Sequence, residues 1–116
     1  AAYGTHAEVR VIYGYPPVVN DTQLAQRFAQ LAAEEGITVT ALPPTMGAED
    51  FAYFAQRIPG VLVRLGIRNE RLEAIYPGHS PEFRIDEGAL PIGVRTLVAF
   101  ATAVGSGRLG GARVRS

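Results

Sequence analysis

The sequence predicts an α/β protein in which strands and helices alternate along the chain and pack in layers. β-branched or apolar runs, which favour strands, occur at residues 7–13, 37–42 and 61–65. Apolar side chains recur at helical spacing at residues 21–36, 48–57 and 86–104. Such alternation is typical of layered α/β folds. The chain has 116 residues, 47% of them hydrophobic, which suits one small domain.

The first predicted strand, residues 7–13, alternates imperfectly and places Val9, Val11 and Tyr13 on one face. Residues 14–20 (GYPPVVN) interrupt it, because two successive prolines remove backbone donors and hold their neighbours extended. We therefore expect a stiff connector that could act as a hinge between two bodies.

The first predicted helix follows this connector. Asn20 or Asp21 is a suitable N-cap, and Gly36 is a suitable end. Its buried stripe is formed by Leu24, Phe28 and Leu31.

The second strand, residues 37–42, stops at two prolines, and a short loop leads to the second helix. In that helix Glu49 and Asp50 occupy the first turn, where carboxylates suit the positive end of the helix dipole. The apolar stripe consists of Phe51, Phe54 and Ala55.

The third strand, residues 61–65, is expected to be buried on both faces. Residues 66–84 have no periodicity, and such long loops in compact domains are usually functional or mobile. The last helix has Asp86 as its cap, and residues 105–116 are expected to form a flexible tail. Its predicted stripe is Leu90, Val94, Leu97, Val98 and Ala101.

Composition excludes several classes of protein. Eleven basic residues, all arginine, balance eleven acidic ones, so no net basic field attracts nucleic acid or anionic lipid. The absence of cysteine excludes a disulfide scaffold, a thiolate-bound zinc and a thiol nucleophile in these residues. No stretch resembles a membrane span or a signal peptide. We expect no nucleic acid or membrane partner and a cytoplasmic location.

Two histidines are present. His6 lies at the start of the first strand, where a surface position without a role is the simplest interpretation. His79 lies in the irregular stretch YPGHSPEF, where a side chain is free to project toward a ligand. From residue type alone, an exposed or loop-pinning histidine and a functional histidine both remain open.

The stretch MGAEDF also has two interpretations. Gly47, Glu49 and Asp50 suit contact with a ligand at a helix N-terminus, and they equally suit ordinary helix capping. Spacing does not bring three metal ligands together, and neither a nucleophile elbow nor a phosphate loop is present.

Three segments together resemble a known family: GYPPVVND, MGAEDFAYFAQRIPG and HSPEFRIDEGALPIGV. In order and spacing they resemble the C-terminal portion of the metal-dependent amidohydrolases related to aminoacylase, hippurate hydrolase and the auxin-conjugate hydrolases. The resemblance covers residues 8–104. It implies that these residues are roughly the last quarter to third of an enzyme. The start at Ala1 and a single methionine, Met46, likewise lead us to expect a processed product or a piece of something longer.

The resemblance also implies a fold, that of a zinc-peptidase-like α/β/α catalytic domain with an inserted lid or dimerisation domain. Residues 1–14 then look like the last strand of the lid, residues 15–104 like the C-terminal part of the catalytic domain, and residues 105–116 like a tail.

The same resemblance implies that His79 is a ligand of a two-metal centre containing zinc, manganese, cobalt or nickel. It places Gly47, Glu49 and Asp50 at the border of the site that binds an N-acyl amino acid. The family's other ligands and its general-base glutamate lie in an upstream part of the sequence that is not among these residues. We therefore assign no catalytic residue here and expect neither amidase activity nor tight metal binding from this chain alone.

An alternative from another class is a stand-alone, non-catalytic α/β module or gene remnant that acts as an interaction protein. In both cases sheet edges normally covered by other strands are left open. We therefore expect a homo-oligomer such as a dimer, or another association through those edges.

Overall fold

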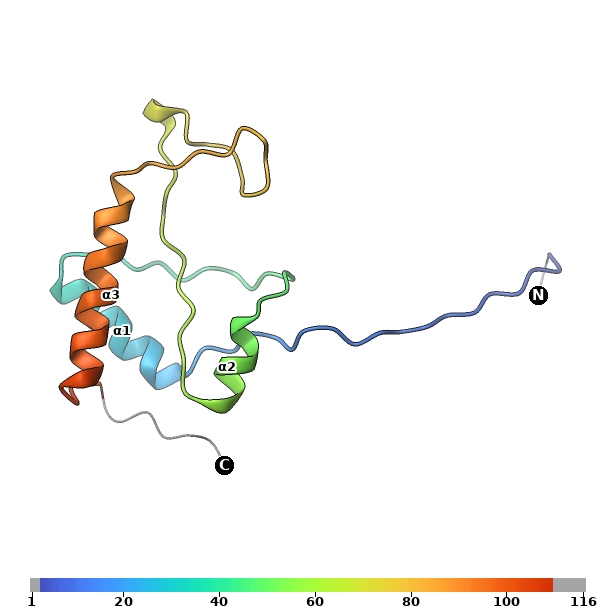
Figure 1. Ribbon diagram of the computed structural model, residues 1–116, viewed down its shortest axis with the longest axis horizontal. Coiled ribbons are helices and arrows are strands. Elements are labelled where there is room, and N and C mark those ends of the chain that lie inside the picture. The colour runs from blue at the N-terminus through green and yellow to red at the C-terminus, as the bar shows by residue number, and fades with distance from the viewer. Residues whose placement is uncertain (1–2, 110–116) are drawn as a thin grey trace.

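The computed structural model describes residues 3–109, and four helical elements lie along them (Figure 1). They are α1 (Thr22–Glu34), α2 (Phe51–Arg57), the short 3₁₀ helix η1 (Glu70–Leu72) and α3 (Ala89–Gly105). Extended stretches join them, and the N-terminal segment projects away from the helices. The radius of gyration is 19.5 Å, whereas a compact domain of 100 residues has about 13 Å. The chain therefore has an open shape.

Helix α1 begins and ends as its sequence predicts. The Asp21 side chain accepts a hydrogen bond of 2.9 Å from the Leu24 N–H, which satisfies one of the free amides at the helix start. Gly36 follows the helix with a φ of 71°, a conformation that suits glycine. The predicted stripe is confirmed, because Phe28 and Leu31 are buried.

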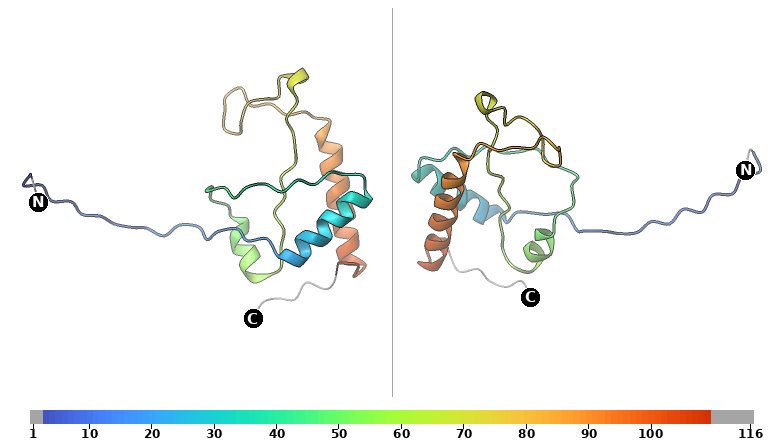
Figure 2. Two further views of the ribbon diagram at one scale, coloured as in Figure 1. Left: turned by 180° about the vertical axis from the view of Figure 1, so that it is seen from behind. Right: turned by 45° about the horizontal axis from the view of Figure 1, so that its top comes forward.

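Helices α1 and α3 are the pair of elements that pack against each other in the described part of the chain (Figure 2). The rings of Phe28 and Phe100 meet edge to face, with 5.5 Å between their centroids. Leu31, Ala103 and Leu109 form the buried cluster beside them. This interface is the core of the structure.

The residues after α3 depart from the predicted flexible tail. Leu109 is buried, and its carbonyl oxygen accepts a hydrogen bond from Arg27 of α1. Arg108 forms a 2.9 Å ion pair with Glu34. Residues 105–109 therefore pack on α1, because the apolar side chain of Leu109 is buried in the small core. The rest of the predicted tail, residues 110–116, lies outside the described residues.

The predicted stripe of α3 does not face the core. Its members are exposed; Leu90, Val94, Leu97 and Val98 have between 49% and 65% of their surface accessible. The face that packs on α1 instead carries Ala99, Phe100 and Ala103. Nearly the whole circumference of α3 is apolar, so periodicity alone did not select the face that contacts α1.

The three predicted strands are extended but unpaired. Between residues 3 and 109 the structure contains no strand, and its single antiparallel bridge joins Asn69 to Ala74. A strand is defined by hydrogen bonds to a neighbour, and residues 7–13, 37–42 and 61–65 find none in this chain. The layered α/β arrangement is therefore not formed by these residues on their own.

One contact partly replaces strand pairing. The Asn20 side chain donates to the Leu62 carbonyl at 3.0 Å and accepts from the Leu62 N–H at 2.8 Å. The Asp21 N–H donates to the Gly60 carbonyl at 2.9 Å. The connector before α1 is thereby fixed beside the stretch that follows α2.

None of the helices in the described range combines the length and apolar content needed to cross a bilayer.

Candidate functional site

The long loop between residues 66 and 88 is closed at its base. Asn69 and Ala74 exchange backbone hydrogen bonds of 3.0 and 2.9 Å. The Asp86 N–H donates to the Ile67 carbonyl at 2.9 Å, and the Asn69 amide donates to the Asp86 carboxylate at 2.7 Å. These bonds tie the two ends of the loop together and leave residues 75–85 to project.

His79 lies in a tight turn of this loop. The Ser80 N–H donates to the Pro77 carbonyl at 3.2 Å, and His79, the third residue of the turn, has a φ of 71°. Histidine is among the few non-glycine residues enriched in this left-handed region. The His79 side chain is exposed. The turn therefore presents an accessible imidazole, which agrees both with an exposed histidine without a role and with a functional one.

Asp86 is the anchor of the loop. The hydrogen bond from Asn69, and next the one from the Gly88 N–H, hold the pKa of the Asp86 carboxyl below its ordinary value of 3.8, against a smaller opposing effect of desolvation. The predicted cap role is partly confirmed. The carboxylate accepts from the Gly88 N–H at 2.9 Å, but α3 itself begins at Ala89.

This lowered pKa predicts how acid affects the loop. The ionised carboxylate makes the bonds, so the stability that it contributes is present above pH 3.8 and is lost as the pH falls through the lowered pKa. NMR titration of the Gly88 amide is expected to show one acidic transition with its midpoint below 3.8, absent in Asp86→Asn. A midpoint at or above 3.8 would contradict the arrangement.

Helix α2, the second predicted helix, starts later than expected, at Phe51 rather than near residue 48. Glu49 and Asp50 precede the helix instead of filling its first turn. The Glu49 carboxylate accepts from the Phe51 N–H at 3.2 Å, so it caps the helix. Gly47 lies in the exposed loop before them, with open space where a Cβ would stand.

Asp50 has a partner that the sequence did not predict. Asp50 is the N-cap residue of α2 but makes no cap hydrogen bond. Hydrogen bonding to Asp50, followed by the negative charge of Asp50, raises the pKa of the Tyr15 phenol above its ordinary value of 10.0. The ring of Tyr15 also lies 5.5 Å from that of Tyr53. The sequence signal that could have singled out Tyr15 is its position directly before two prolines.

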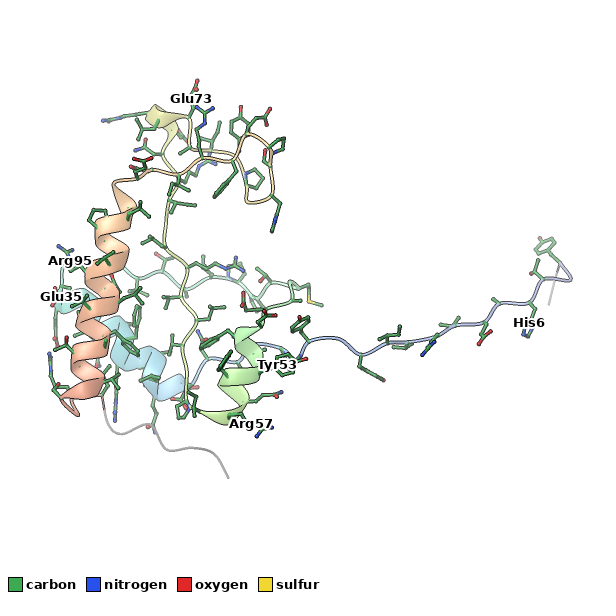
Figure 3. All side chains as sticks on the ribbon, in the orientation of Figure 1. His6, Glu35, Tyr53, Arg57, Glu73 and Arg95 are labelled. Carbon is green, nitrogen blue, oxygen red and sulfur yellow. The ribbon has the colours of Figure 1, made fainter. Side chains whose placement is uncertain are left out.

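The candidate residues do not assemble a metal site by themselves. Within residues 3–109, no three side chains of histidine, aspartate, glutamate or cysteine gather closely enough to hold a metal ion. Gly47, Glu49 and Asp50 form one group, and His79 stands in another loop. His6 lies on the projecting N-terminal segment, away from the helices (Figure 3).

Three known proteins that are similar to this chain carry the names of hydrolytic enzymes. Over 92 residues it is 38% identical to thermostable carboxypeptidase 1 of Saccharolobus solfataricus. That alignment covers 78% of this chain and 23% of the relative. It is 38% identical to IAA-amino acid hydrolase ILR1-like 6 of Arabidopsis thaliana, covering 75% of this chain and 19% of that protein. It is 35% identical to N-acetyldiaminopimelate deacetylase of Streptococcus suis, in an alignment that covers 75% of this chain and 22% of that protein.

The chain thus spans about a fifth to a quarter of the length of these relatives. No solved structure matches it. The model of peptidase family M20/M25/M40 matches residues 4–103, which is most of the sequence. That match includes both the turn with His79 and the head of α2, and the chain belongs to peptidase family M20/M25/M40.

Proposed function

We propose that this chain forms part of a metal-dependent hydrolase that cleaves the amide bond of N-acyl amino acids. Its contribution is one metal ligand, His79, and part of the substrate pocket wall at Gly47, Glu49 and Asp50. The observation that carries the proposal is the family match over residues 4–103 together with the exposed His79 turn. Peptidases of this family generally depend on divalent metals.

The substrate class is supported by the names of two relatives. One is named an IAA-amino acid hydrolase and the other an N-acetyldiaminopimelate deacetylase. Both names describe an amino acid that carries an acyl group. An N-acyl amino acid is therefore the substrate class that we propose for the whole enzyme, of which this chain is one part.

The role of His79 follows from its chemistry and position. Neutral imidazole is a good ligand for zinc, manganese, cobalt and nickel. The turn exposes the His79 ring, and the hydrogen bonds at Asn69 and Asp86 hold the base of its loop. A catalytic metal needs about three protein ligands, and the described residues supply one, so the remaining ligands belong to other parts of the enzyme.

We further propose that the layered α/β/α fold forms when the rest of the catalytic domain is present. Residues 37–42 and 61–65 are already extended, and the apolar stripe of α3 is exposed and ready to cover a sheet. Residues 1–14 are the lid strand and residues 15–104 the catalytic part in this proposal. Without that sheet, the exposed apolar side chains favour association, including a homodimer. Because these apolar side chains are exposed, a non-catalytic interaction module is the alternative to a part of a hydrolase.

The purified 116-residue chain is expected to show no turnover of N-acetyl or N-benzoyl amino acids with added Zn²⁺, Mn²⁺, Co²⁺ or Ni²⁺. The reason is that one imidazole without further ligands or a general base neither holds nor activates a metal-bound water. The N-acetyldiaminopimelate deacetylase of Streptococcus suis, assayed in parallel on N-acetyldiaminopimelate, is the positive control for the assay. Turnover by the isolated chain would overturn the assignment of the missing ligands to other residues.

A further inference from the structure

Asn69 uses both its backbone and its side chain at the base of the loop that carries His79. Its backbone N–H donates to the Ala74 carbonyl at 3.0 Å, and its carbonyl accepts from the Ala74 N–H at 2.9 Å. Its side-chain oxygen accepts from the Arg71 N–H at 3.0 Å. Its side-chain amide donates to the Asp86 carboxylate at 2.7 Å. Asn69 therefore shapes the outgoing arm of the loop, residues 66–74, and joins it to the returning arm, residues 84–88.

Asp86 supplies the matching contacts from the returning arm. One carboxylate oxygen accepts from Asn69, and the other accepts from the Gly88 N–H at 2.9 Å. The Asp86 N–H donates to the Ile67 carbonyl at 2.9 Å. Because α3 begins at Ala89, shortly after Asp86, the bond between Asn69 and Asp86 connects the outgoing arm to the start of α3. Figure 1 shows the loop projecting beside this end of α3.

A second contact between the two arms is much more exposed. Arg84 and Glu73 form an ion pair at 3.5 Å, with 54% and 78% of their side-chain surfaces accessible. Water and salt screen such a pair, so it adds little to stability. Asn69 and Asp86 are both half-buried, and a hydrogen bond to an ionised carboxylate is among the stronger ones. The Asn69–Asp86 bond is therefore the side-chain contact that is suited to fix the two arms.

We propose that Asn69 is a positioning residue, which through its bond to Asp86 holds residues 75–85, and with them His79, in one orientation relative to α3. Asn69 acts through the loop and does not itself touch a metal or a substrate. Its importance for metal binding rests on the proposed function, in which His79 is a ligand; the fixing of the loop does not. A displacement of about 1 Å in a catalytic site can cost about 100-fold in rate, so a ligand on a projecting loop requires a fixed base.

The two side chains allow a test in which donor and acceptor are exchanged. Asparagine and aspartate have the same shape and differ by an amide nitrogen in place of an oxygen. In Asn69→Asp two carboxylates face each other. In Asp86→Asn one oxygen is left for the two donors, Asn69 and the Gly88 N–H. In the double variant, Asn69→Asp with Asp86→Asn, the amide at position 86 donates to the carboxylate at position 69, and the remaining oxygens still accept from Arg71 and Gly88.

The orientation of the loop is measured in the full chain by residual dipolar couplings of backbone N–H groups, at neutral pH in a weakly aligning medium. In the wild type the couplings of His79 and Ser80 are expected to fit the same alignment as those of α3. In each single variant they are expected to shrink toward zero, because the loop then samples many orientations. In the double variant they are expected to return to the wild-type values.

Hydrogen exchange supplies a second readout. Losing one hydrogen bond in either single variant is expected to speed exchange of the Ala74 amide by roughly fivefold or more, and the double variant is expected to restore it. Arg84→Gln is the matched control, because it removes the exposed ion pair, and both the couplings and the exchange are expected to stay unchanged. Exchange in α1 is expected to stay the same in all variants, which separates these effects from general unfolding.

Two results would overturn the proposal. One is a set of couplings at His79 and Ser80 that keeps its wild-type values in both single variants. The other is a double variant whose couplings stay near zero although exchange in α1 is unchanged. Neither measurement uses a metal or catalysis. Failure here leaves the proposed hydrolase function standing, whereas failure of the hydrolase function leaves the fixed loop intact.

Discussion

Replacing Phe28 by alanine is expected to separate α1 from α3 and to unfold the only core in residues 3–109. Phe28 has 8% of its surface exposed, and its ring contacts that of Phe100. Removing a buried phenylalanine costs about 3–5 kcal/mol, a large part of the roughly 5–15 kcal/mol that stabilises a typical domain. No second pair of packed elements in the described chain compensates for this loss.

The measurement is thermal unfolding followed by far-ultraviolet circular dichroism. Gln30→Ala is the matched control, because Gln30 is exposed on the same helix; its effect is expected to stay within about 0.5 kcal/mol. Leu31→Ala is expected to behave like Phe28→Ala, since Leu31 belongs to the same core. An unchanged unfolding midpoint in Phe28→Ala would show that the α1–α3 contact does not hold the structure together.

The helices could be predicted from the sequence because their signals are local. Asp21 and Gly36 mark the ends of α1 by interactions within a few residues, and the stripe of α1 follows from its spacing. Even so, the start of α2 differed from the prediction by three residues. The helix end is the part of the pattern that neighbouring loops decide.

The strands could not be confirmed in the same way, because pairing depends on residues far away in the sequence. Residues 61–65 have the composition of a buried strand, yet Val63 and Leu65 are exposed in this chain. Likewise Leu97 of α3 lies at a position suited to a core that these residues do not supply. Composition indicates that a segment is suited to be a strand, and the presence of a neighbouring strand determines whether a sheet forms.

The candidate site shows the same division. His79 could be singled out because its loop has no periodicity and is flanked by glycine and proline. The contact between the rings of Tyr15 and Tyr53 could not, because it joins two segments whose approach depends on how the connector crosses α2. Glu49 and Asp50 are adjacent in sequence, and only the structure shows that Glu49 rather than Asp50 accepts the N–H bond at the start of α2.

The second large effect concerns His79 in a complete enzyme. We expect a chimera to hydrolyse N-acetyldiaminopimelate when this chain replaces the stretch of the Streptococcus suis deacetylase with which it aligns at 35% identity. In that chimera His79→Ala is expected to lower kcat/KM by more than about 100-fold, because even residues that only support a ligand change metal affinity or activity by about 10–100-fold.

His6→Ala in the same chimera is the matched control. It removes the other histidine of the chain, which lies on the projecting N-terminal segment. We expect its kcat/KM to equal that of the unmodified chimera. Equal losses in the two variants would point to a general effect of removing imidazoles rather than to a role of His79.

The metal content of the purified chimera tests the central claim, that His79 binds metal, most directly. Elemental analysis after removal of free metal is expected to find less bound metal per chain in His79→Ala than in His6→Ala, by about tenfold or more. Equal metal content in the two variants, with His79→Ala correctly folded by circular dichroism, would contradict the assignment of His79 as a metal ligand.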